Sequence, residues 1–121
     1  MSVGVLLAVG ALGGMGAIGR FLLDGAVSRR IAGGFPFGTL VVNLSGAFAL
    51  GLLLGVALEG DAYRELGTGL IGGYTTFSTW ALEAHRLGED GRTRLGLANL
   101  LVSLALGIAI AWVGHEVGTT L

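Results

Sequence analysis

The fold is decided by the stretch Gly72-Gly73-Tyr74-Thr75-Thr76-Phe77-Ser78-Thr79-Trp80, which lies inside an uncharged run from residue 66 to residue 82. Two glycines followed by β-branched threonines disfavour a continuous helix. If this run crosses a membrane, a break in it frees backbone groups, which are tolerated at that depth only where protein or a cavity covers them. We therefore predict a membrane-crossing helix that breaks near Gly72–Thr75.

The rest of the chain supports a membrane environment. Of its 121 residues, 53% are apolar and 12% are charged, against roughly 25% charged in an ordinary soluble domain. Three more uncharged runs cover residues 1–19, 31–58 and 95–115, each near or above the roughly 18 residues that suggest a membrane helix. We predict an all-α membrane protein, a single four-helix domain over residues 1–121 with transmembrane helices at Val3–Leu23, Phe37–Leu58, Leu66–Leu87 and Leu95–Gly114.

Several function classes are disfavoured at this stage. The connections between the predicted helices are too short for a soluble catalytic domain, and no nucleophile with a positioned base is visible, so we do not expect an enzyme. A net charge of −1 gives no footprint for nucleic acid. The chain has no cysteine, which removes disulfides and thiolate ligands. Membrane lipid is the expected surrounding.

Glycine is abundant, with 24 residues, and in lipid small residues let helices pack closely. The pairs Gly10 with Gly14 and Gly51 with Gly55 have the spacing of such contacts. The segment Gly14–Gly19 also matches a dinucleotide-binding fingerprint, but that motif needs a βαβ unit and a later acidic residue, both missing here. We therefore predict packing, not nucleotide binding.

The arginines are distributed unevenly. The connections after the first and third predicted helices share one side of the membrane, and the first of them is expected at Asp24–Pro36. Six arginines lie on that side and only Arg64 on the other. By the positive-inside tendency, both chain termini should lie outside the cytoplasm.

Polar residues at membrane depth predict an ion path. Carbonyls released at a helix break can coordinate a cation, whereas the amino end of a half-helix can face an anion. Asn43 lies deep in the second predicted helix, and the fourth carries a polar and small stripe of Asn99, Ser103, Gly107 and Ala111. Hydroxyls bonded back to the preceding turn and polar contacts between helices are the alternatives.

An anion suits these residues better than a cation. Rings of Asp or Glu usually mark cation channels, and the predicted helix interiors hold none. The ring edge of Phe77 carries positive potential that could face an anion, and Arg20 near a helix end could attract one. A proton-coupled four-helix exporter of dual topology is the main rival, but it needs a deep carboxylate. A helical subunit that only scaffolds a larger complex is a second rival.

Three ordered motifs carry a resemblance to a known family. They are Gly16-Ala17-Ile18-Gly19-Arg20, then Phe37-Gly38-Thr39-Leu40-Val41-Val42-Asn43-Leu44-Ser45-Gly46, then the Gly72–Trp80 stretch. Together they resemble the CrcB/Fluc fluoride channels over all four predicted helices. The resemblance implies a fluoride-specific channel of the cell inner (plasma) membrane that lets cytoplasmic fluoride leave passively and so lowers its toxicity.

The resemblance also implies an assembly and a set of site residues. The assembly would be an antiparallel dimer with two pores and a structural sodium ion (Na+) at the central interface, held by backbone carbonyls of Gly72 and Thr75. The fluoride path would be lined by Asn43, Phe77, Thr79 and Ser103, with Thr76 and Ser78 as neighbours. Glu83 and Arg20 match vestibule positions of the family.

The chain departs from the family pattern in three respects. Trp80 stands where the family usually has a second pore phenylalanine, so it would also line the fluoride path; it keeps a polarised edge and adds an N–H donor. Asn99 replaces a commonly aromatic or hydroxyl residue. The arginine bias is unexpected for a chain that inserts both ways, so the second subunit is either an identical chain or an oppositely oriented homologue.

Overall fold

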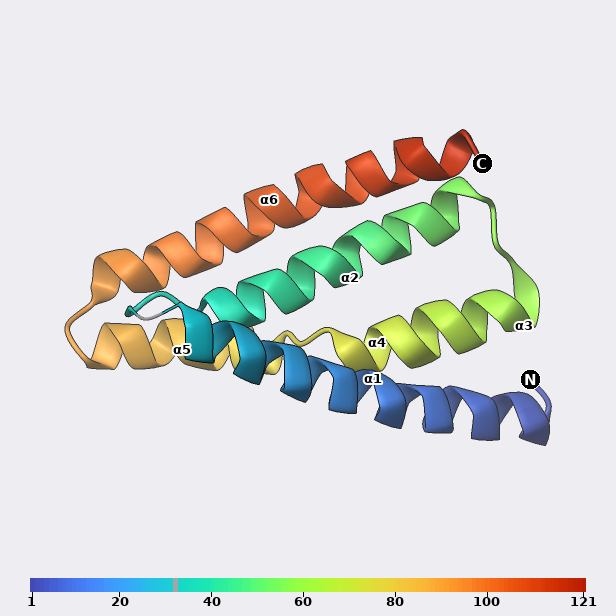
Figure 1. Cartoon of the computed structure of the whole chain (residues 1–121), viewed down its shortest axis with the longest axis horizontal. Helices are drawn as coiled ribbons and strands as arrows, with labels where there is room; N and C mark the ends of the chain where they lie inside the picture. The colour runs from blue at the N-terminus through green and yellow to red at the C-terminus, as the bar shows by residue number, and fades with distance from the viewer. Residues whose placement is uncertain (32) are drawn as a thin grey trace.

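The computed structural model describes residues 1–31 and 33–121, which form helices and no strand. Successive long helical segments run in alternating directions along the long axis, and both chain ends lie at the same end of the molecule (Figure 1). The elements are α1 Val3–Arg30, α2 Phe37–Gly55, α3 Gly60–Tyr63, the π-helical segment η1 Arg64–Ile71, α4 Gly72–Tyr74, α5 Ser78–Glu89 and α6 Thr93–Thr119. The all-helical prediction is confirmed.

Three helices in the described residues, α1, α2 and α6, are long and apolar enough to cross a membrane. The segment between α2 and α6, here called the third leg, spans residues 60–89. It consists of α3, η1 and α4 before a break and α5 after it (Figure 1). This arrangement is consistent with four predicted crossings of which the third is bent.

Several predicted helix ends differ from the structure: the third helical stretch begins at Gly60 instead of Leu66, and α6 ends at Thr119 instead of Gly114. Helix α1 continues to Arg30, beyond the predicted loop start at Asp24. Its last turns are supported by Ser28, whose hydroxyl donates to the Asp24 carboxylate at 3.2 Å, and by arginines that complement the carboxyl end of the helix dipole. Helix α2 ends at Gly55, before the predicted Leu58, because the chain turns through Ala57 at a φ of 57°.

The predicted break exists, but it lies slightly later in the chain. Gly72 and Gly73 are helical, and the backbone leaves the helix at Thr75, with φ −85° and ψ 162°. Helix α5 begins at Ser78. Gly73 serves packing instead, since a Cβ there would collide with the backbone of Gly13 in α1.

Glycines bring two pairs of legs into backbone contact. A Cβ on Gly51 or Gly55 of α2 would collide with backbone carbonyls of α6, as predicted for this pair. Gly10 and Gly14 make no such contact within the described part of the chain, because a Cβ at either position meets no atom of a neighbouring helix within 4 Å. Gly16, inside the rejected dinucleotide fingerprint, packs against the third leg.

Adding one methyl group at Gly114 of α6 should destabilise the fold. Its Cβ would collide with the Phe48 carbonyl oxygen and lie 3.2 Å from the Leu52 nitrogen, both backbone atoms of α2. We expect Gly114→Ala to lower the midpoint of thermal unfolding in detergent. Gly107→Ala, on the same helix and with no described atom within 4 Å, should be neutral or slightly stabilising because alanine favours helix by about 1 kcal/mol. Equal midpoints for the two variants would contradict this packing.

Candidate functional site

The broken third leg is held in place by the side chain of Asn43. Its Nδ2 donates to the Thr76 carbonyl oxygen at 2.8 Å, and its Oδ1 accepts from the Thr76 N–H at 2.9 Å. One amide thus satisfies both backbone groups of a residue that lies outside any helix. Buried backbone groups need such partners, so the break is a defined structure.

Two threonine hydroxyls complete the ends of the flanking helices. The Thr75 hydroxyl donates to the Ile71 carbonyl oxygen at 3.1 Å, and the Thr76 hydroxyl accepts from the Thr79 N–H at 3.1 Å. Bonding back to the preceding turn, the alternative weighed from the sequence, therefore holds for Thr75.

These hydrogen bonds leave two backbone carbonyls without the N–H partners of a continuous helix. In a continuous helix the Thr76 N–H would donate to the Gly72 carbonyl and the Thr79 N–H to the Thr75 carbonyl. Here both N–H groups donate to side chains instead. Gly72 is also exposed. The break thus releases the two carbonyls predicted from the family resemblance to bind a cation.

A cavity of about 460 Å³ lies beside the break, between α2 and α6. The structure brings five of the predicted path residues to its wall, together with Thr75: Asn43, Thr76, Phe77, Trp80 and Ser103. Gly107 and Ala111 of the predicted α6 stripe also line it. Thr79 and Ser78 are not among the lining residues, and Ser78 is exposed.

Trp80 and Asn99 form a contact that the sequence did not reveal. The indole N–H of Trp80 donates to the backbone oxygen of Asn99, and Asn99 Nδ2 donates to the backbone oxygen of Trp80, both at 3.1 Å. The indole N–H, expected as a possible donor to an anion, is therefore directed to α6. The Trp80 ring also meets Phe77 edge to face, with centroids 5.3 Å apart.

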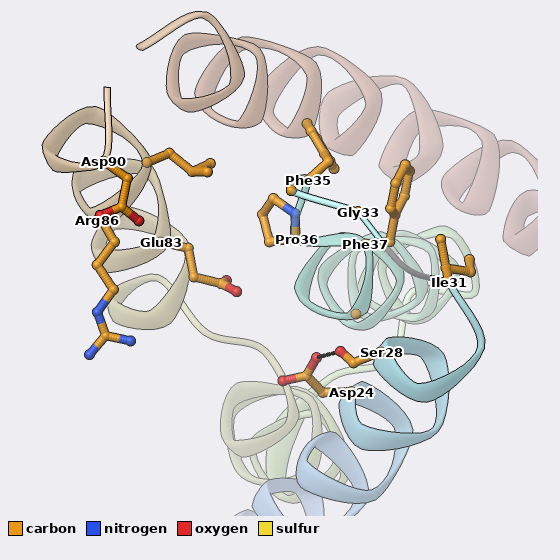
Figure 2. Close-up of a pocket in the computed structure, with 13 residues that line it drawn as sticks. Asp24, Ser28, Ile31, Gly33, Phe35, Pro36, Phe37, Glu83, Arg86 and Asp90 are labelled. Atoms are coloured by element: carbon orange, nitrogen blue, oxygen red, sulfur yellow. Dashed lines mark hydrogen bonds between the residues drawn. The ribbon is translucent and has the colours of Figure 1, made fainter. Parts of the chain in front are cut away.

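A second cavity, of about 370 Å³, lies at the end where α1 connects to α2. Figure 2 shows the Glu83 carboxylate directed toward its middle, Asp24 bonded to Ser28, and the Arg86 guanidinium turned away. Glu83 Oε1 is shielded from solvent and has no hydrogen-bond partner in the described part of the chain. Arg20, the other predicted vestibule residue, does not line this cavity.

The arrangement suits binding and passage of a small ion. Among residues 1–31 and 33–121, no group of three or more His, Cys, Asp or Glu side chains could hold a metal ion. The oxygen and nitrogen groups at the break are uncharged backbone, amide and hydroxyl groups. Such groups can replace part of an ion's hydration shell.

Comparisons with known proteins identify the family of the chain. The family model described as "CrcB-like protein, Camphor Resistance (CrcB)" matches residues 7–115. A protein of Mycolicibacterium paratuberculosis named "Fluoride-specific ion channel FluC 2" is 52% identical over 115 residues, covering 95% of this chain and 94% of the relative.

Proteins of other organisms are similar as well. A "Fluoride-specific ion channel FluC" of Solibacter usitatus is 44% identical, with 91% of this chain and 93% of the relative covered. A "Fluoride-specific ion channel FluC 2" of Haloarcula marismortui is 45% identical, with 86% and 87% covered. With a family match over most of its length and relatives of this similarity, the chain belongs to the CrcB-like family.

Proposed function

We propose that this chain forms a fluoride-specific channel in the cell membrane, through which cytoplasmic fluoride leaves passively. The observation that carries the proposal is the cavity at the broken third leg, whose wall includes Asn43, Thr76 and Ser103 together with Phe77. The names of the related proteins supply the ion.

The chemistry of the cavity fits a small, strongly hydrated anion. Hydroxyl and amide groups can donate hydrogen bonds in place of water, yet they hold the anion weakly enough to release it. The ring edge of Phe77 offers a further region of positive potential. Hydrogen fluoride crosses membranes uncharged and dissociates in a near-neutral cytoplasm, so a passive exit for the anion lowers fluoride toxicity.

The lining of this cavity disfavours the alternative of a proton-coupled exporter. Such a transporter exchanges protons on an ionisable group deep in the membrane. No Asp, Glu, His, Lys or Arg is among the described residues that line the cavity. Glu83 lines the other cavity, near the α1–α2 connection.

We propose that a second, antiparallel subunit completes the path. Phe77 is 75% exposed in the single chain, and Gly72 and Ser78 beside the break are exposed as well. Polar backbone at membrane depth needs protein or a cavity beside it. A second subunit over this face would cover the break.

A structural sodium ion between the subunits is part of the same proposal. The Gly72 and Thr75 carbonyls have lost the N–H groups that a continuous helix would provide, and carbonyl oxygens can replace the hydration shell of an alkali cation. An antiparallel partner would bring the same two carbonyls from the opposite direction, which makes four oxygen ligands.

Fluoride efflux from liposomes that contain this chain alone tests the proposed function. We expect fluoride efflux that needs no proton gradient, and chloride efflux no faster than from protein-free liposomes. Efflux that appears only when an oppositely oriented homologue is added would assign the second subunit to that homologue. Efflux that requires a proton gradient would support the exporter, and no fluoride efflux in either preparation would reject the channel.

Replacing the exposed ring of Phe77 tests its role in the path. Phe77→Ile keeps an apolar side chain but removes the polarised ring edge, so we expect slower fluoride efflux. Phe21→Ile is a matched control, because Phe21 of α1 is 76% exposed and lies outside the cavity. Equal efflux for the two variants and the unmodified chain would remove Phe77 from the path.

The sodium proposal makes a separate prediction. An ion held between subunits should not exchange during transport, so replacing external sodium with potassium should leave fluoride efflux from preassembled protein unchanged. Protein kept free of sodium from extraction onward should lose efflux and regain it when sodium is added. Efflux that rises and falls with external sodium would indicate coupled transport instead.

A further inference from the structure

Trp80 and Asn99 are joined by two hydrogen bonds that run in opposite directions between α5 and α6. The indole N–H of Trp80 donates to the Asn99 backbone oxygen, and the Asn99 side chain donates to the Trp80 backbone oxygen, each at 3.1 Å. Asn99 is 1% exposed, so its amide is enclosed by the protein.

The side chain of Asn99 lies behind the cavity wall. Trp80 and Ser103 line the cavity of about 460 Å³, whereas Asn99 does not. The side-chain oxygen of Asn99, Oδ1, accepts a hydrogen bond from the Ser103 hydroxyl at 3.4 Å. One buried amide therefore contacts two residues of the wall without reaching the space where an ion would pass.

One of the two hydrogen bonds restricts the Trp80 ring, because its donor is the indole N–H, and the other holds the Trp80 backbone against α6. The indole N–H fixes one edge of the ring against α6, and the ring also packs edge to face against Phe77. A ring held by packing alone could rotate more freely. Because water is scarce at membrane depth, the enclosed hydrogen bonds have few competing partners.

We propose that the Asn99 side chain is a positioning group for the anion path: its hydrogen bond to the Trp80 backbone ties α5 to α6, which keeps the indole N–H within reach of the Asn99 backbone oxygen and the ring beside Phe77. Asn99 acts through Trp80 and does not touch the anion. The inference rests on the proposed channel function, but the position of the indole can be measured without any transport.

The first measurement follows the indole N–H signal of Trp80 by nuclear magnetic resonance. In a Trp112→Phe background Trp80 is the only tryptophan, and Trp112 is 65% exposed on α6. We expect Asn99→Leu to shift the Trp80 indole signal and to slow fluoride efflux about tenfold, as the loss of a buried hydrogen bond can do. Ser103→Ala is the matched control on the same wall, and it should leave the indole signal in place.

The second measurement is a double-mutant cycle on fluoride efflux. If Asn99 acts through the Trp80 side chain, Trp80→Phe combined with Asn99→Leu should be no slower than the slower single variant. Losses that multiply would show that Asn99 acts independently of the ring and would overturn the proposal. An unshifted indole signal in Asn99→Leu would also overturn it.

A third measurement needs no change at Asn99 and so covers the case in which Asn99→Leu does not fold. In the unmodified chain, the Trp80 indole hydrogen should exchange with deuterium much more slowly than that of Trp112, because it is bonded to α6. Equally fast exchange at both would overturn the proposal. If fluoride efflux fails in the unmodified chain while slow exchange is found, the channel function is wrong and the Trp80–Asn99 contact stands.

Discussion

The hydrogen bonds between Asn43 and Thr76 are the interaction on which the rest of the site depends. A helix cannot break inside a membrane unless its freed N–H and C=O groups find partners. Asn43 offers a donor and an acceptor on one short side chain, and both are used by Thr76. An unpaired amide at this depth would cost on the order of 2 kcal/mol or more, so the side chain and the break stabilise each other.

Helix α2 is the common support of this arrangement. Its glycines at positions 51 and 55 allow backbone contact with α6, and its side chain at position 43 holds the break. The cavity lies between these features, so α2 sets the distance from the broken leg to Ser103 on α6. The close packing of Gly51 and Gly55 on α6 and the contact of Asn43 with Thr76 therefore support the same cavity from one helix.

The sequence predicts more of the fold than of the site. Uncharged runs and the glycine-threonine stretch predicted the helices and the bend, because burial in lipid acts on whole segments. Gly10 and Gly14 have the same spacing as Gly51 and Gly55 but make no close contact within the described part of the chain, since spacing alone does not say which face of α1 meets a neighbour. The Trp80–Asn99 contact was missed because the two residues lie 19 positions apart and meet only through the register of α5 on α6.

The two cavities differ in a way that follows from electrostatics. Carboxylates and an arginine line the one beside the α1–α2 connection, at the end of the molecule that carries most of the arginines. Uncharged groups line the one at the break. A charge is costly at membrane depth but is hydrated near an end. The carboxylates of the cavity beside the α1–α2 connection repel an anion, so attraction falls to the arginines at the same end, while neutral groups in the middle let the anion pass without trapping it.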